Sequence, residues 1–192
     1  MKKIVLASAS PRRKQLLEQM NLVFEVKPST AGEILDKRLK PEEVVIELAK
    51  QKALNIAHKE KDSIVIGSDT IVFMNEILGK PDNELHAFEM LNKLSGKTHY
   101  VYTGIAVIDT TTNKLITDYE KTAVKMRQLS SEEIKGYVST GEPIDKAGAY
   151  GIQGLGSIFI EKIEGCYFNV VGLPVSKLYS ILNQFGIDVF KK

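Results

Sequence analysis

A short apolar run that leads directly into a helix start is the feature that most restricts how this chain folds. Ile4–Ala7 is continuously apolar, which is typical of a buried strand. Ser10 then occupies a helix N-cap position, and Pro11 occupies the first helical position, where the missing N–H of proline costs nothing. Leu16 and Leu17 continue at helical spacing. The sequence therefore predicts a strand whose carboxyl end leads into a helix N-terminus.

Two hydroxyls and two guanidinium groups surround this predicted helix N-terminus. They belong to Ser8, Ser10, Arg12 and Arg13. The first backbone N–H groups of a helix are unpaired and lie at the positive end of its dipole, which favours a bound anion. Arginine guanidinium groups match the geometry of phosphate oxygens. This pattern predicts a phosphate-binding site, and the alternative is a capped helix with two solvated arginines.

Composition narrows the class of protein. With 192 residues and a net charge of +2, the chain is long enough for one well-filled core with two lobes, and the charge argues against bulk nucleic-acid or membrane binding. Cys166 is the one cysteine, so no intrachain disulfide forms. The histidines have no metal-binding spacing, and no apolar run reaches transmembrane length. The run after Lys2-Lys3 is too short for a signal peptide, so we expect a cytoplasmic protein.

A lysine on an apolar helix face and an aspartate after a buried strand are further candidates. Pro41 opens a helix, and Lys52 falls within its apolar face, where it must snorkel, pair or point into a cleft. Ile64–Ile66 predicts a central strand that ends just before Asp69 and Thr70. Ligands bind beyond the carboxyl ends of such strands, although an aspartate at this place also suits a turn cap.

The remaining chain predicts further strands and helices without an internal repeat or linker. Ser130 and Glu133 form a capping box for a short helix. The glycine-rich stretch 142–154 matches neither the P-loop nor the dinucleotide-binding pattern. The other expected features are a strand at Val23–Val26, a loop at Pro28–Leu39, a hairpin of Ile71–Phe73 with Glu76–Leu78, a helix capped by Asp82, strands at His99–Asp109, Leu115–Met126 and Phe159–Val171, and a helix at Pro174–Phe185.

Five motifs along nearly the whole chain resemble those of the Maf family of nucleotide pyrophosphatases, also known as septum-formation proteins. The motifs are Ser8–Arg13, Gly67–Thr70, Leu78–Pro81, Lys146–Gly154 and Asn169–Pro174. The resemblance implies one Maf-like domain over residues 1–192. It implies an α/β fold with a central mixed, twisted sheet flanked by helices and two lobes around a deep cleft, similar to inosine triphosphate pyrophosphatases.

The resemblance also implies a reaction, the hydrolysis of a nucleoside triphosphate to the monophosphate and pyrophosphate with Mg²⁺ or Mn²⁺. A triphosphate carries about four negative charges, so the site needs cations and a base for water. Asp69 is the expected general base, and Lys52, Lys80 and Arg12 are the expected cations. Ser8 and Ser10 are expected hydrogen-bond donors. Glu33 is expected to position metal or water together with Asp69, although Thr30–Gly32 before it differs from the acidic version common in the family.

Base preference follows the same resemblance. Arg13, Thr70, Lys80 and Gln153 resemble the branch that acts on dTTP and UTP in nucleotide-pool house-cleaning. An amide such as that of Gln153 both donates to and accepts from a pyrimidine edge. The alternatives are a pyrophosphatase with another base preference, such as 7-methyl-GTP, and a nucleotide-binding regulator of division with little catalysis. The expected partner is a nucleoside triphosphate, without nucleic acid or membrane, and a homodimer is one open alternative.

Overall fold

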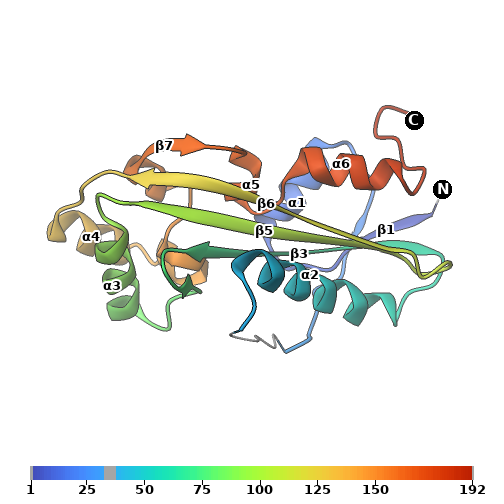
Figure 1. The fold of residues 1–192 in the computed structure, drawn as a ribbon, viewed down its shortest axis with the longest axis horizontal. Coiled ribbons are helices and arrows are strands. Elements are labelled where there is room, and N and C mark those ends of the chain that lie inside the picture. The colour runs from blue at the N-terminus through green and yellow to red at the C-terminus, as the bar shows by residue number, and fades with distance from the viewer. Residues whose placement is uncertain (1, 33–37, 192) are drawn as a thin grey trace. The chain divides into compact units, whose positions relative to one another are not determined.

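The structure, a computed structural model, describes residues 2–32 and 38–191 of the chain (Figure 1). These residues form two compact units. Of the described residues, unit 1 comprises 2–32, 38–69, 103–120 and 172–191, and unit 2 comprises 70–102 and 121–171. Within the described ranges, no helix is long and apolar enough to cross a membrane.

In the described part of the chain, the strands form one mixed sheet of seven strands in the order β2-β1-β3-β5-β6-β7, with β4 paired to β3. β1 is parallel to both β2 and β3, whereas β4 on β3 and β7 on β6 are antiparallel. The strands are β1 (Lys3–Leu6), β2 (Glu25–Val26), β3 (Ser63–Phe73), β4 (Ile77–Leu78), β5 (Thr98–Asp109), β6 (Leu115–Met126) and β7 (Ile160–Glu164). The predicted α/β class with a mixed sheet is therefore confirmed.

Six α-helices and three 3₁₀ segments accompany the sheet in the described residues (Figure 1). The α-helices are α1 (Pro11–Gln19), α2 (Pro41–Ala57), α3 (Glu84–Leu94), α4 (Ser131–Val138), α5 (Tyr167–Val171) and α6 (Val175–Asn183). The 3₁₀ segments are η1 (Glu142–Asp145), η2 (Ala147–Ala149) and η3 (Leu155–Phe159). Ser10 caps α1, and the capping box of Ser130 and Glu133 opens α4, as predicted.

In unit 1, α2 packs on the strands through two glycines that let the backbones approach. A Cβ atom on Gly67 of β3 would lie 2.3 Å from the carbonyl oxygen of Ala49, and one on Gly104 of β5 would lie 2.1 Å from that of Val45. Buried residues such as Val5 and Ala53 fill the contact around them. This close packing fixes the distance between α2 and the sheet, and it therefore also fixes the position of Lys52 relative to the sheet.

Unit 2 has its own apolar core, built from β3, α3, β5, β6 and α4 and from the segment that follows α4. Leu91 of α3, Met126 of β6 and Ile134 of α4 are fully buried in it. The rings of Tyr137 and Phe159 meet edge to face in the same core, with centroids 4.9 Å apart. Phe159 thereby anchors the end of the glycine-rich segment to α4.

Several local predictions were wrong. β3 continues through Phe73, so Asp69 and Thr70 lie within this strand and not at its end. The N-cap of α3 is Asn83, whose side chain accepts from the backbone N–H of His86, and not Asp82. The strand expected over Phe159–Val171 ends at Glu164 and is followed by α5. The strand expected at Val23–Val26 covers only β2.

Candidate active site

Lys52 and Asp69 form an ion pair in unit 1. The Nζ atom of Lys52, on α2, donates to the Oδ1 atom of Asp69, on β3. Both side chains are largely shielded from solvent, with 16% and 11% of their area exposed. The lysine on the apolar helix face therefore pairs instead of snorkelling, and the aspartate orients towards α2 instead of capping a turn.

Asp69 lies just beyond the parallel part of the sheet, although it is inside a strand. The parallel pairing of β1 with β3 ends at Leu6 and Ile66, and the backbone N–H of Ala7 donates to the carbonyl oxygen of Ile66 at 2.8 Å. Ser8 follows on one strand and Asp69 on the other. The general expectation that site residues follow the carboxyl ends of parallel strands thus applies to this pair of strands.

The start of α1 is a connected polar network. Ser10 Oγ accepts from the backbone N–H of Arg13 at 3.5 Å, and Ser8 Oγ accepts from the backbone N–H of Ser10 at 3.3 Å. The guanidinium of Arg13 donates to Ser8 Oγ at 3.1 Å and to the carbonyl oxygen of Gly172 at 2.8 Å. Arg13 is only 9% exposed, so the alternative of two solvated arginines is wrong for this residue. Arg12 is half-buried.

Sequence reasoning missed Ser68, which supports this network from β3. Its hydroxyl is fully buried and donates to the carbonyl oxygen of Gly172 at 3.3 Å. Side chains alternate along a strand, so Ser68 lies on the face opposite to Asp69. This alternation could have placed Ser68 from the sequence, but the predicted strand ended before Ser68.

Unit 2 holds the other predicted residues. Thr70 is half-buried on β3, and Lys80 is exposed after β4. The carbonyl oxygen of Gly79 accepts from the backbone N–H of Gly148 at 2.9 Å, which ties the segment of Lys80 to the glycine-rich segment. Gln153 is half-buried and lies in that glycine-rich segment, just before η3.

The structure thus brings together two groups of predicted residues. One is the pair of Lys52 and Asp69, and the other contains Ser8, Ser10 and Arg13. Of the predicted residues, unit 1 contains Ser8, Ser10, Arg12, Arg13, Lys52 and Asp69, and unit 2 contains Thr70, Lys80 and Gln153. Glu33 lies outside the described residues. The roles assigned to these residues remain predictions.

The donor set suits a magnesium-like ion only with help from a substrate. Among residues 2–32 and 38–191, no group of three or more histidine, cysteine, aspartate or glutamate side chains is placed so that it could hold a metal ion. Mg²⁺ is commonly held by one or two carboxylates, substrate phosphates and water. Asp69 offers one such carboxylate, so its chemistry fits an ion that arrives with a nucleotide.

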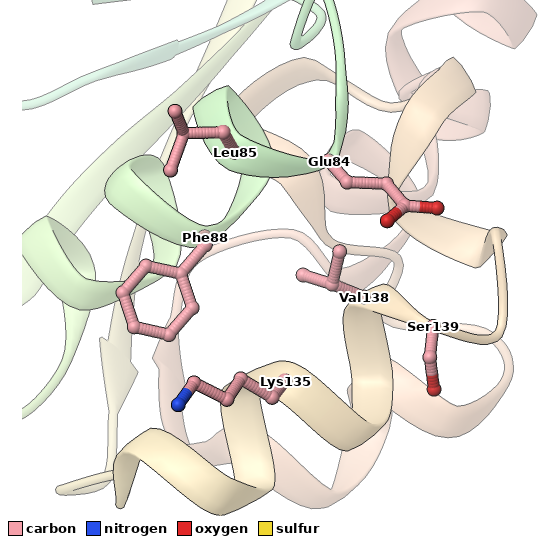
Figure 2. Close-up of a pocket in the computed structure, with 6 residues that line it drawn as sticks. All are labelled: Glu84, Leu85, Phe88, Lys135, Val138 and Ser139. Atoms are coloured by element: carbon pink, nitrogen blue, oxygen red, sulfur yellow. The ribbon is translucent and has the colours of Figure 1, made fainter.

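A pocket of about 390 Å³ lies elsewhere in unit 2, between α3 and α4 (Figure 2). Leu85, Phe88 and Val138 supply its apolar surface, and Glu84 and Lys135 are charged residues on its wall. None of the predicted site residues that the structure describes lines it. It is therefore separate from the chemistry described above.

Comparison with known proteins identifies the family. The profile of the family described as "Maf-like protein" matches residues 3–185, so the chain belongs to this family. The resemblance inferred from the five motifs is confirmed.

Individual relatives are similar over almost the entire chain. A protein of Caldicellulosiruptor saccharolyticus named dTTP/UTP pyrophosphatase is 50% identical over 196 residues, which cover 100% of this chain and 98% of that protein. A Bacillus cereus protein of the same name is 53% identical over 190 residues, which cover 98% and 93%. A solved Mycobacterium abscessus nucleoside-triphosphatase / dITP/XTP pyrophosphatase shares 12% identity over 96% of this chain and 94% of that chain, with a TM-score of 0.45, too low to support an argument.

Proposed function

We propose that this chain is a nucleoside triphosphate pyrophosphatase that hydrolyses dTTP and UTP to the monophosphate and pyrophosphate, as a house-cleaning enzyme of the cytoplasmic nucleotide pool. The observation that carries this proposal is the name shared by relatives that are about half identical over essentially the entire chain. The Lys52–Asp69 pair supports it, since the reaction needs a carboxylate beside a positive charge.

Asp69 acts as the general base in this proposal. Its carboxylate takes a proton from a water molecule as the water oxygen attacks the α-phosphorus. The bond between the α-phosphorus and the oxygen that bridges to the β-phosphate breaks, and pyrophosphate leaves with that oxygen. Lys52 holds the carboxylate in orientation through the ion pair and offsets part of the negative charge that Asp69 presents to the anionic substrate.

The phosphates are bound by charge and hydrogen bonds. Arg12 and Lys80 supply positive charge, and Ser8 and Ser10 at the start of α1 supply hydrogen-bond donors beside the positive end of the helix dipole. Mg²⁺ or Mn²⁺ would be held by Asp69, with Glu33 as a second carboxylate, and would supply charge neutralisation of the departing pyrophosphate.

Arg13, Thr70 and Gln153 are the residues proposed to select the base. The buried network around Arg13 holds its guanidinium rigidly, which suits recognition because a fixed polar group discriminates against bases that leave it unpaired. Gln153 offers an amide donor and an amide acceptor, which match the alternating groups of a pyrimidine edge.

A pyrophosphate-release assay tests the proposal. The purified chain with Mg²⁺ is offered dTTP, UTP, dCTP, ATP, GTP and 7-methyl-GTP at equal concentrations, and kcat/KM is measured for each. We expect dTTP and UTP to be the best substrates. If 7-methyl-GTP were turned over fastest, the proposed base preference would be wrong. If dTTP bound tightly but released no pyrophosphate, the alternative of a nucleotide-binding regulator of division would be favoured.

A further inference from the structure

One carboxylate outside the predicted site gathers three hydrogen bonds from around the glycine-rich segment of unit 2. Glu142, at the first position of η1, accepts from the backbone N–H of Leu155 at 3.0 Å and from that of Gly156 at 3.2 Å. It also accepts from the hydroxyl of Tyr137 at 2.9 Å. A side chain from the segment after α4 therefore binds the backbone at the start of η3.

Tyr137 extends this connection to the other side of the same turn. Its phenolic oxygen accepts from the backbone N–H of Gly151 at 3.3 Å, and its ring is buried against Phe159. Glu142 and Tyr137 together thus hold N–H groups two residues before Gln153 and two and three residues after it. We call the stretch Gly151–Gly156 the Gln153 turn.

The backbone of the Gln153 turn lies directly on the carboxylate. Gly154 has φ of 109°, a conformation that residues with a side chain rarely adopt, and a Cβ atom there would lie 2.9 Å from an oxygen of Glu142. On the other flank, the side chain of Lys146 packs over Gly151, where an added Cβ would lie 2.7 Å from Cε. The turn is therefore shaped to fit these two side chains.

The carboxylate of Glu142 is charged at neutral pH. Burial raises its pKa, but the N–H groups of Gly156 and Leu155, the Tyr137 hydroxyl and the nearby Lys146 outweigh burial and lower the pKa below its usual value. Hydrogen bonds to a charged acceptor are stronger than neutral ones. The turn is therefore held by strong bonds on one side of Gln153.

We propose that Glu142 is a positioning residue for base selectivity: it fixes the backbone of the Gln153 turn, with Tyr137, so that the Gln153 amide meets the base in one orientation. Recognition by an amide is sensitive to small displacements of its backbone, because misplaced donors and acceptors lose their partners. The inference rests on the proposed function, in which Gln153 contacts the base. Glu142 itself acts through the backbone and contacts no substrate atom.

The first test is Glu142→Gln, which keeps the size of the side chain but replaces an accepting oxygen by an amino group. At least one of the three hydrogen bonds is then lost. We expect kcat/KM for dTTP relative to that for dGTP to fall by about tenfold, through a higher KM for dTTP, while kcat for dTTP changes by less than about twofold. In a Gln153→Ala background, the same substitution should cause no further loss of this ratio, because the two residues act as one unit.

A matched control is Glu133→Gln in the same unit. Glu133 is also a hydrogen-bonded carboxylate, which accepts from Arg127 at 2.6 Å and from the N–H of Ser130 at 2.8 Å, but it bonds no residue of the Gln153 turn among the described contacts. The Glu133→Gln substitution should lower the melting temperature and leave the ratio of kcat/KM for dTTP to kcat/KM for dGTP unchanged. Tyr137→Phe removes the acceptor for Gly151 and should lower the ratio even if Glu142→Gln folds poorly.

Hydrogen exchange of the backbone amides reports the cause independently of activity. The amides of Gly151, Leu155 and Gly156 should exchange faster in Glu142→Gln than in the wild type, and those of Glu133→Gln should not. A wild-type enzyme that prefers dTTP, with Glu142→Gln and Tyr137→Phe variants that keep the full preference, would overturn the inference and leave the proposed function standing. A wild-type chain that releases no pyrophosphate from any triphosphate would overturn both.

Discussion

At the scale of single residues, the proposed chemistry depends on the largely shielded ion pair between Lys52 and Asp69. Lys52 lies on α2 and Asp69 lies on β3, 17 residues later in the chain. A charge removed from water is unfavourable unless it is paired, and this pair satisfies that requirement. The ion pair also orients the lysine and the carboxylate relative to each other.

Asp69→Asn tests the role of the carboxylate directly. The asparagine side chain keeps an oxygen that accepts from Lys52 but takes no proton from water. We expect kcat for dTTP to fall by about 10²–10⁴-fold, while dTTP affinity is kept or increases because one negative charge has gone. Steady-state kinetics, nucleotide titration and a melting curve on one preparation measure all three quantities.

The chain offers a close control for this substitution. Asp109 has the same exposed fraction as Asp69, 7%, and accepts from Lys2 Nζ at 2.6 Å. Lys2 and hydrogen bonds from the loop lower the pKa of Asp109 to about 2. Asp109→Asn should lower the melting temperature and leave kcat unchanged. Equal kcat in both variants would remove the base assignment from Asp69.

His99 gives a pH dependence of stability that its burial explains. The ring is fully buried, Nε2 lies 2.7 Å from the hydroxyl of Tyr150, and Nδ1 has no hydrogen-bond partner among residues 2–32 and 38–191. Burial lowers the pKa of His99 from 6.5 to about 4. Between pH 6.5 and about pH 4, His99 therefore binds a proton in the unfolded chain but not in the folded chain.

The contribution of neutral His99 to the free energy of unfolding is consequently fully present above pH 6.5 and is lost as the pH falls towards 4. The loss is about 1.4 kcal/mol per pH unit, or about 3 kcal/mol over the window. Urea unfolding between pH 7.5 and 4 measures how the free energy of unfolding depends on pH. It should fall less steeply with falling pH for His99→Phe than for the wild type, regardless of the difference between the two proteins at pH 7.5. His58→Gln, at an exposed position, should keep the wild-type slope.

At the scale of elements, the contact of α2 with the sheet is set by glycines, and this predicts opposite effects for two similar substitutions. Gly67→Ala places a Cβ atom against the backbone of Ala49 and Ala53, which cannot move away as a side chain can. We expect the free energy of unfolding to fall by about 1–3 kcal/mol or more. At Gly136 in α4, an added Cβ atom would have no atom of the described residues within 4 Å apart from its chain neighbours and the backbone of its own helix, so Gly136→Ala should raise the free energy of unfolding by about 1 kcal/mol. Urea unfolding of the two variants measures both, and a tolerated Gly67→Ala would contradict the close packing.

Local sequence patterns predicted most elements but placed the end of β3 too early. The apolar run Ile64–Ile66 was found, whereas Ser68 and Asp69 gave the impression that the strand had ended. Their polar groups are satisfied by Gly172 and Lys52, which lie far away in sequence. Such long-range partners leave no local pattern, so the continuation of the strand was not predictable from the stretch itself.

The same limit applies to the candidate site. The cap of α1 by Ser10 was predictable, since a cap and its helix are adjacent in sequence. The carbonyl oxygen of Gly172, one acceptor of the Arg13 guanidinium, was not predictable, because it comes from the other end of the chain. Likewise, nothing in the sequence marked Glu142, whose partners Leu155 and Gly156 are 13 and 14 residues away in irregular backbone.

At the scale of the whole molecule, the charge of the chain is small compared with that of its proposed substrate. The net charge is +2, and a triphosphate carries about four negative charges. In the described part of the chain, Lys52 is committed to Asp69, and Lys80 is exposed, where water screens its charge. Binding of the triphosphate and departure of pyrophosphate are therefore expected to gain from the further positive charge that the proposed divalent metal would supply.

Removal of divalent metal should consequently stop the reaction. In excess EDTA we expect pyrophosphate release from dTTP to fall by about 10²-fold or more, and Mg²⁺ or Mn²⁺ added beyond the EDTA should restore it. A magnesium titration of the residual activity of Asp69→Asn then separates two roles of the carboxylate. A metal ligand shifts the half-saturating Mg²⁺ concentration upwards, because the ion loses a negatively charged partner, whereas a base lowers kcat at an unchanged half-saturating concentration. Undiminished turnover in EDTA would contradict the metal requirement and leave neutralisation of the leaving group to lysine and arginine side chains.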